Sequence, residues 1–260
     1  MLFENVGIIC PRQFKEIPGA FITKNIIGHK TVSAYDINSL FPLYIYSTVQ
    51  KQDLFSDHES AEKKPNIKPE IFEMLNKLYA TSPSIPLLTK EREVKGEVFT
   101  PEEMFYYIYA VLYSNVYRTK YAEFLKIDFP RIPFTSNYKL FIKFGKLGKQ
   151  LADLHLLKSD YLNKPISKFS GKGDNKVTQR PKYDNEKVYI NATQYFTNVK
   201  EEVWNYQIGG YQVCDKWLKD RKDRELSLDE IETYCKIVTA LSKTIELQKK
   251  IDENYEWVEK

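Results

Sequence analysis

The side chains best able to do chemistry are lysines and arginines, which gather in three stretches of the chain. Residues 112–149 carry eight basic and two acidic residues, 158–187 carry eight and four, and 216–224 carry five and two. Acidic residues predominate instead in 50–104 and 225–260. Basic segments with interleaved aromatic residues are typical of proteins that bind a polyanion. The alternative is that these lysines are ordinary solvated residues on helix faces.

A second candidate is segment 203–222, which combines two tryptophans, two adjacent glycines and a basic run. It predicts a strand, a turn at Gly209-Gly210 and a short helix that starts near Tyr211. Backbone N–H groups at a helix N-terminus after two glycines can approach a phosphate closely. Gln207 and Gln212 could form bidentate hydrogen bonds with adenine. The alternative is a tight turn, with the side chains of Val213, Trp217 and Leu218 as buried anchors.

Two glycine-containing segments resemble nucleotide or cofactor loops only superficially. The segment Gly145–Lys149 lies inside an amphipathic helical pattern and does not match the P-loop spacing. The segment Phe169–Gly173 imitates the F-x-G-x-G loop that holds S-adenosylmethionine, but a polar loop precedes it and Asp174-Asn175-Lys176 follows it. A lone glycine-rich match without its strand and helix is weak, so neither segment predicts a cofactor site.

The remaining candidates for catalysis also have structural explanations. Glu70 with Glu93-Val94-Lys95 could be forced into a metal-nuclease pattern, but Glu70 opens a predicted helix, where its charge is favourable. His29, His58 and His155 are isolated from any second ligand or nucleophile in the sequence. We therefore identify no catalytic motif in this chain, and whether it is part of an enzyme stays open.

Composition narrows the class of protein. The 260 residues have a mean hydropathy of −0.49 and no apolar run long enough to cross a membrane, and the N-terminus lacks a signal-peptide pattern, so we expect a cytoplasmic protein. Cys10, Cys214 and Cys235 are widely spaced, which favours reduced, buried thiols over disulfides or zinc. The 19 tyrosines suggest a binding surface, although many recur at helical spacing and then indicate packing.

Several elements must position these side chains, and their pattern predicts an α+β fold with a small mixed sheet packed against several helices. Short strands are expected in residues 1–46, and another at 187–191. A helix should start at Pro69-Glu70, with Ile71, Leu75 and Leu78 as its apolar stripe. Other helices should run from the Thr100 capping box to about Phe124, from Ser136 to Leu157, and from the Ser227 capping box onward.

We divide the chain into two parts on this pattern. Residues 1–98 are the strand-rich recognition part with polar loop insertions. Residues 99–260 are the helical and mixed part, with the basic loop 158–187 and a C-terminal helix.

Longer segments resemble a known family. They are Trp204–Val213 with Lys216–Arg221, Phe105–Leu112 with Tyr117-Arg118, Tyr121-Ala122 and Phe129–Phe134, together with Gly148–Leu157, Phe41–Tyr46 and Val6–Gln13. These segments resemble the C-terminal specificity region of type ISP single-chain restriction-modification enzymes, across nearly the whole chain. In that family a nuclease, a translocating ATPase and an adenine-N6 methyltransferase precede a target recognition domain.

The resemblance implies a module that recognises a specific double-stranded DNA sequence in the cytoplasm of a prokaryote and has no cofactor of its own. It implies that the upstream parts are missing here. S-adenosylmethionine, ATP and Mg would belong to those parts, and the methyltransferase domain would be a partner. An alternative is a protein-interaction or scaffold domain that docks onto the methyltransferase, with exposed apolar patches along 105–121. A third, an independent S-adenosylmethionine enzyme, would bind its cofactor at Gly171–Gly173.

Family resemblance does not locate the base-reading residues, so the expected DNA contacts rest on charge and spacing. Lysine and arginine side chains should contact phosphates, and polar side chains from 164–187 and from the Gly209-Gly210 turn should contact base edges. The expected residues are Arg118, Lys120, Lys168, Lys172, Lys176, Arg180, Lys182, Gln207, Tyr211, Gln212, Lys216 and Lys219.

Overall fold

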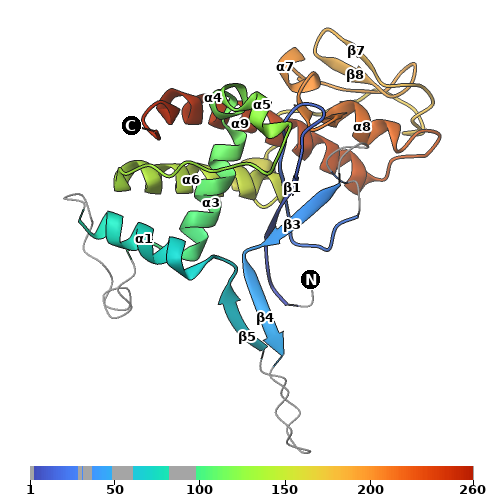
Figure 1. Ribbon diagram of the computed structural model, residues 1–260. Coiled ribbons are helices and arrows are strands. Elements are labelled where there is room, and N and C mark those ends of the chain that lie inside the picture. The colour runs from blue at the N-terminus through green and yellow to red at the C-terminus, as the bar shows by residue number, and fades with distance from the viewer. Residues whose placement is uncertain (1–2, 29–30, 32–36, 49–60, 82–97, 260) are drawn as a thin grey trace, which may run out of the picture.

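The N-terminal strands form a small antiparallel sheet. In the computed structural model, which describes residues 3–28, 31, 37–48, 61–81 and 98–259, the strand order is β2-β1-β3. The strands are β1 (Gly7–Pro11), β2 (Phe21–Thr23) and β3 (Asn38–Pro42), and β1 is buried throughout. A second pair, β4 (Tyr44–Thr48) and β5 (Ala61–Pro65), forms an antiparallel ribbon that projects from the body of the protein (Figure 1).

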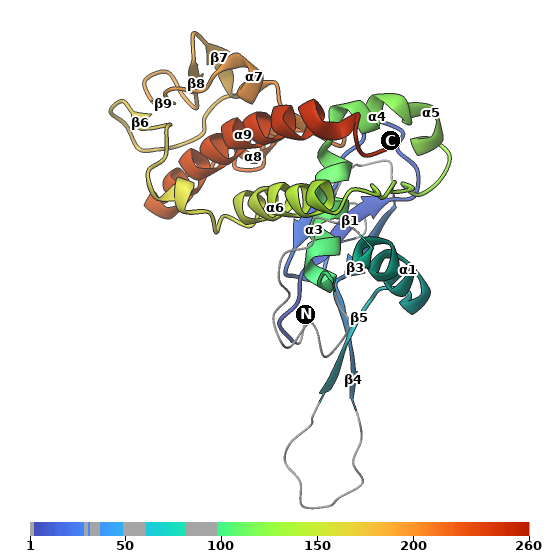
Figure 2. The ribbon, with the colours of Figure 1, turned by 90° about the vertical axis from the view of Figure 1, so that its left-hand side faces the viewer.

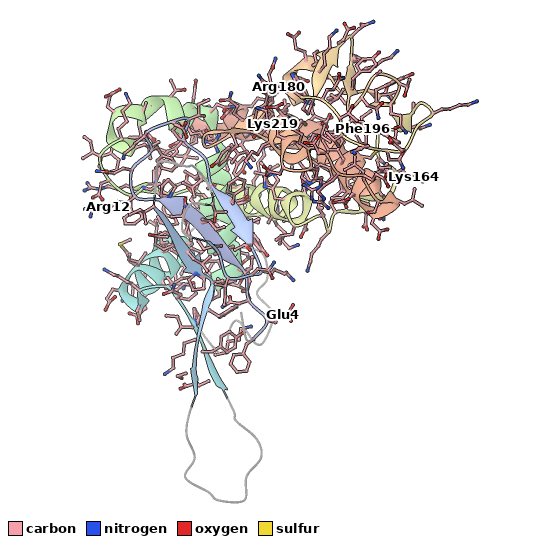
Figure 3. All side chains as sticks on the ribbon, turned by 90° about the vertical axis from the view of Figure 1, so that its right-hand side faces the viewer. Glu4, Arg12, Lys164, Arg180, Phe196 and Lys219 are labelled. Atoms are coloured by element: carbon pink, nitrogen blue, oxygen red, sulfur yellow. The ribbon has the colours of Figure 1, made fainter. Side chains whose placement is uncertain are left out.

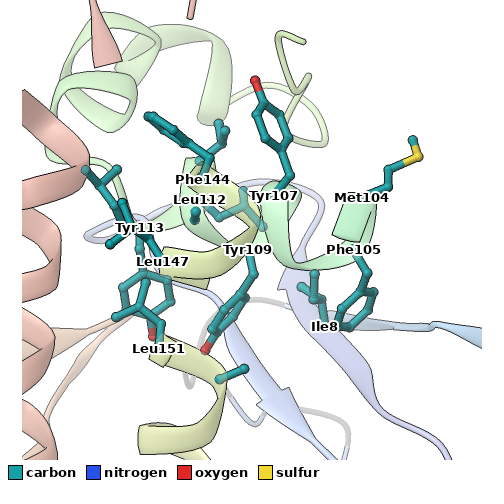
Figure 4. Close-up of a cluster of buried hydrophobic side chains, with 14 of the residues drawn as sticks. Ile8, Met104, Phe105, Tyr107, Tyr109, Leu112, Tyr113, Phe144, Leu147 and Leu151 are labelled. Atoms are coloured by element: carbon teal, nitrogen blue, oxygen red, sulfur yellow. The ribbon is translucent and has the colours of Figure 1, made fainter. Parts of the chain in front are cut away.

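Helices pack around this sheet and bury most of the aromatic side chains. They are α1 (Pro69–Ala80), α3 (Pro101–Tyr113), α4 (Asn115–Lys120), α5 (Ala122–Leu125), α6 (Tyr138–His155) and the 3₁₀ turn Asp160–Asn163. Helices α3 and α6 cross at a glycine, because a Cβ atom on Gly148 would lie only 1.8 Å from the carbonyl oxygen of Tyr106. The glycines of segment Gly145–Lys149 therefore belong to a close helix crossing, at the cluster drawn in Figure 4.

The remaining elements surround the long C-terminal helix. A four-stranded antiparallel sheet has the order β6-β9-β8-β7, and it lies across α9 from α6 (Figure 2). Its strands are β6 (Phe169–Ser170), β7 (Lys182–Asp184), β8 (Lys187–Tyr189) and β9 (Tyr195–Phe196). They are followed by α7 (Glu201–Trp204), β10 (Gln207–Ile208), β11 (Tyr211–Gln212), α8 (Val213–Lys219) and α9 (Leu228–Tyr255).

Hydrophobic side chains gather in two clusters that α9 connects. Tyr234 and Val238, in the first half of α9, pack with the four-stranded sheet and α8, whereas Ile251 and Tyr255 pack with α3, α4 and α6. At 1.5 Å per residue, the 28 residues of α9 extend over roughly 40 Å. The α+β class is confirmed, and the paired strands form several small antiparallel sheets. The division at residues 98 and 99 stays a prediction.

Several predicted helix boundaries need correction. The helix that Thr100 caps ends at Tyr113, because the backbone of Ser114 is extended. The Ser114 hydroxyl accepts the N–H of Tyr117 and thereby caps the next helix, α4. The cap of α6 is Asn137, one residue after the predicted Ser136. The predicted apolar stripe of α1 is only partly buried, since Leu75 is enclosed but Ile71 and Leu78 remain exposed.

The buried tyrosines explain much of the unusual composition. Tyr79, Tyr107 and Tyr117 donate hydrogen bonds to three backbone carbonyls of one irregular segment, those of Thr135, Pro133 and Arg131, at 2.7, 2.8 and 3.0 Å. A segment outside regular secondary structure needs such partners when it packs against a core. These tyrosines therefore fix the connection between α5 and α6, which supports packing over a binding surface as their role.

The capping box of α9 gives a stability prediction. The Ser227 hydroxyl accepts the N–H of Glu230, and the Glu230 carboxylate accepts the N–H of Ser227, both at 3.1 Å. Replacing Ser227 with alanine is expected to lower the free energy of unfolding by about 1 kcal/mol, measured by chemical denaturation. Ser159→Ala is the matched control, because Ser159 occupies an N-cap position without a side-chain hydrogen bond. An equal loss in both variants would contradict the capping role.

Candidate nucleic-acid interface

The second and third basic segments meet at the start of α9. Lys176 and Glu225 form an antiparallel bridge, and the N–H of Leu226 donates to the carbonyl of Asn175 at 3.0 Å. Beside them, the N–H of Asp223 donates to the carbonyl of Val177 at 2.8 Å. Backbone hydrogen bonds thus join residues that are about fifty positions apart in the sequence. This junction places the two segments side by side at the start of α9.

Five of the predicted contact residues belong to segment 168–182, which runs from the residue before β6 to the start of β7, and we call these five residues the basic surface. They are Lys168, Lys172, Lys176, Arg180 and Lys182. All are exposed except Lys176, which is half-buried. Among the described residues, none of the five has a carboxylate within 4.0 Å of its charged group. In Figure 3, Lys164, Arg180 and Lys219 lie in the upper part of the molecule, above Arg12 and Glu4. The basic surface is therefore available to an external anion.

Arg118 and Lys120, from the first basic segment, have partners within the protein. Lys120 forms an ion pair with Glu259, beyond the C-terminal end of α9, whereas the basic surface adjoins its N-terminal end. Arg118 Nε donates to the carbonyl of Leu112 at 2.7 Å, and its guanidinium lies 4.9 Å from the ring centroid of Tyr113. The structure thus brings together the second and third segments but leaves Lys120 apart. A DNA-contact role for these two residues stays a prediction.

The basic side chains of α8 form ion pairs along their own helix. Lys216 pairs with Asp220, and Lys219 Nζ lies 2.5 Å from the Asp215 carboxylate. Both lysines keep an exposed face, but their charge is partly compensated. Lys216 also lies 5.5 Å from the ring centroid of Tyr211. These residues are therefore weaker phosphate contacts than the basic surface.

The Gly209-Gly210 turn serves a different purpose from the one its sequence suggests. A Cβ atom on Gly210 would lie 1.8 Å from a carboxylate oxygen of Glu16, and one on Gly19 would lie 2.5 Å from the backbone nitrogen of Gly209. The loop around Glu16 thus covers the turn, and a carboxylate stands beside Gly210. This packing favours the tight-turn interpretation over phosphate binding. Of the anchors in α8, Leu218 is fully buried and Val213 and Trp217 are partly buried.

The segment Phe169–Gly173 uses its glycines for internal packing. Gly171 has a φ of +103°, and a Cβ atom there would lie 2.1 Å from the carbonyl oxygen of Thr193. The Thr193 hydroxyl donates to the carbonyl of Lys172 at 2.8 Å. A Cβ atom on Gly173 would meet the side-chain oxygen of Gln194. The residues around these glycines therefore do not fit S-adenosylmethionine, because the protein itself fills the space that the loop would give to the cofactor.

A polar groove opens next to the basic surface, between β7 on one side and α7 with α8 on the other. It measures about 560 Å³ and is lined by Arg180, Pro181, Lys182, Tyr183, Glu201, Trp204, Asn205, Gln212 and Asp215. The rings of Tyr183 and Trp204 stack with an interplanar angle of 11° and a centroid separation of 5.7 Å. Sequence reasoning missed Asn205, although it lies between two aromatic residues in a segment that we had singled out. Gln207, in contrast, is exposed on β10 outside this groove.

Comparison with known proteins identifies the family of this chain. A family model described as the Type ISP C-terminal specificity domain matches residues 2–250. The chain belongs to this family. No protein among those with curated descriptions matches it.

Solved structures resemble the specificity domain over nearly its whole length. The ATP-dependent Type ISP restriction-modification enzyme LlaBIII bound to DNA matches 96% of the chain, with a TM-score of 0.65 and 20% identity. A nuclease-deletion mutant of the Type ISP restriction-modification enzyme LlaGI, in complex with a DNA substrate mimic, matches 95% of the chain, with a TM-score of 0.63 and 17% identity. A DrdV-DNA complex matches 95% of the chain, with a TM-score of 0.71 and 19% identity. The predicted family resemblance is confirmed.

The specificity domain corresponds to 16%, 18% and 25% of the chains in those three structures. Within the described ranges, no helix is long and apolar enough to span a membrane, and no three His, Cys, Asp or Glu residues are grouped so as to hold a metal ion. Its three cysteines are buried thiols, and burial raises the pKa of Cys10 and of Cys214 to about 12. These thiols are therefore poor nucleophiles at neutral pH.

Proposed function

We propose that this specificity domain recognises a specific sequence in double-stranded DNA for a restriction-modification enzyme. The observation that carries the proposal is the basic surface itself: four of its five cations are exposed, none has a carboxylate partner in the described part of the chain, and its segment is hydrogen-bonded to the third basic segment. Phosphate contacts from such a surface supply affinity, and neighbouring polar groups supply sequence choice. The similar solved structures, which are described as complexes with DNA or a DNA mimic, support the proposal.

Catalysis then belongs to other parts of a larger enzyme. Those parts would include the adenine-N6 methyltransferase and nuclease, and they would use S-adenosylmethionine, ATP and Mg. The family membership and the small share of each solved enzyme that this chain matches support such a division of labour. We place the enzyme in the cytoplasm of a prokaryote, where its DNA substrate would be accessible.

An apolar groove supports a second candidate function, docking onto the methyltransferase domain. It measures about 660 Å³ and lies between the N-terminal sheet, α1 and α3, where Phe41 and Ile71 remain exposed. Phe105, Ile108 and Leu112 of α3 form part of its wall, whereas most of α3 is buried within this chain. Exposed apolar surface of this kind commonly marks a protein contact. Docking and DNA recognition use different faces, so both can hold.

Salt dependence of DNA binding tests the proposal directly. The purified chain is expected to bind duplex DNA with an affinity that falls by about a hundredfold between 50 and 200 mM salt, because about four neutralised phosphates give a slope near −0.9 per contact. Fluorescence anisotropy with a labelled duplex, over a series of salt concentrations, measures this slope. Binding that is absent at 50 mM salt would reject DNA recognition by this chain and favour docking alone.

A further inference from the structure

The polar groove beside the basic surface differs from that surface in its chemistry. The basic surface presents only positive charge, whereas the groove also contains carboxylates, from Glu201 and Asp215. Asp215 is paired with Lys219, but Glu201 is exposed and has no ion pair in the described residues. A free carboxylate repels phosphate. Because the groove combines the cations of Arg180 and Lys182 with a free carboxylate, it suits a ligand surface that offers both hydrogen-bond donors and acceptors.

Asn205 contributes to this groove a side-chain amide that can both donate and accept hydrogen bonds. Its side chain is exposed, and no described residue bonds to its amide. Its backbone is fixed, because Asn205 ends α7 and its N–H donates to the carbonyl of Glu201 at 2.9 Å. The backbone position of this amide is therefore set before binding, and the ordering cost on binding is confined to the side chain.

The other polar groups support this position and do not compete for it. Gln212 donates its side-chain amide to the carbonyl of Trp204, which holds β11 against the end of α7. The stacked rings of Tyr183 and Trp204 connect β7 to α7. Gln212, which the sequence had suggested as an adenine contact, is thus at least partly committed to holding the groove together. Arg180 lies on the opposite wall and links the groove to the basic surface.

We propose that Asn205 determines specificity by reading an adenine in the major groove of the target DNA. This inference rests on the proposed function. An asparagine amide matches adenine in particular, since its oxygen accepts from N6 and its nitrogen donates to N7. With the basic surface on the phosphates, Asn205 stands at the adjoining base edges. The carboxylate of Glu201 further disfavours a second phosphate at this place.

Selection from random duplexes tests the role of Asn205. The wild-type chain is incubated with a random-sequence duplex library, and the bound fraction is sequenced. We expect a motif that contains an adenine, and we expect Asn205→Ala to lose the preference for that adenine by about tenfold or more, with the other positions unchanged. Asn205→Asp keeps the shape but exchanges the donor for an acceptor, and it should shift the preference at this position towards cytosine.

Controls separate this inference from the proposed function. Asn163→Ala removes an exposed amide outside the groove and should leave the motif intact. The salt slope of duplex binding by Asn205→Ala should match that of the wild type, since no phosphate contact is removed. If the wild type selects no motif, the proposed function fails and the inference fails with it. If the wild type selects a motif that both Asn205 variants also select unchanged, the inference alone is overturned.

Discussion

Replacing Lys168, Lys172, Arg180 and Lys182 together with glutamine is expected to weaken duplex DNA binding on the order of 10³-fold at 0.1 M salt. Each phosphate that a cation neutralises releases counterions, and a slope near −0.9 per contact corresponds to about eightfold in affinity at this salt concentration. The four side chains are exposed and have no carboxylate partner in the described structure, so their removal leaves no buried charge behind. The dissociation constant, measured by anisotropy titration, should rise while the salt slope becomes shallower.

A second quadruple variant distinguishes local contacts from overall charge. Lys126, Lys139, Lys143 and Lys146 belong to the first basic segment and are also exposed. Their replacement with glutamine changes the net charge by the same amount, and it should change affinity far less. Similar losses in the two quadruple variants would show that net charge alone drives binding. Unfolding curves for both variants should match the wild type, because single exposed lysines contribute little to stability.

The sequence predicted local structure best where the signal is itself local. Both capping boxes, at Thr100 with Glu103 and at Ser227 with Glu230, form as predicted, because their partners lie three residues apart. The interruption at Ser114 was missed, since its apolar flanks continue the helical pattern on both sides. Only the packing of α4 against α9 shows why the chain must turn there, where Ser114 Oγ donates to Asp252 at 2.8 Å.

Long-range packing decided the candidate site, and this part could not be predicted. The charge segments were visible in the sequence, but the junction between Lys176 and Glu225 that joins two of them was not. The sequence of the Gly209-Gly210 turn suggests a phosphate-binding loop, but in the structure the turn is covered by Glu16, nearly two hundred residues earlier in the chain. A glycine requires close approach, but the sequence does not tell whether a ligand or the protein itself approaches.

A half-buried histidine links three helices and gives the chain a built-in sensitivity to acid. Tyr109 of α3 lies 2.7 Å from His155 Nδ1, and Thr244 of α9 lies 2.9 Å from His155 Nε2. The Thr244 hydroxyl donates to the carbonyl of Ala240, so its oxygen accepts from Nε2–H and leaves Nδ1 to accept from Tyr109. Both ring nitrogens are therefore satisfied only when the imidazole is neutral. Protonation of Nδ1 would place two donors against each other.

Lowering the pH is expected to destabilise the folded chain through His155. Burial, and to a lesser extent the charge of Arg118, lowers the pKa of His155 to about 3 from an ordinary value of 6.5. Between these values the unfolded chain binds a proton that the folded chain excludes, so stability falls as the pH decreases from about 6.5 towards 3. The loss attributable to His155 reaches about 2 kcal/mol at pH 5. Urea unfolding at pH 7 and pH 5 measures this loss.

The variant His155→Gln should be less stable than the wild type at pH 7. Its free energy of unfolding should fall by about 2 kcal/mol less between pH 7 and pH 5. An unchanged loss would assign the acid sensitivity to carboxylates elsewhere.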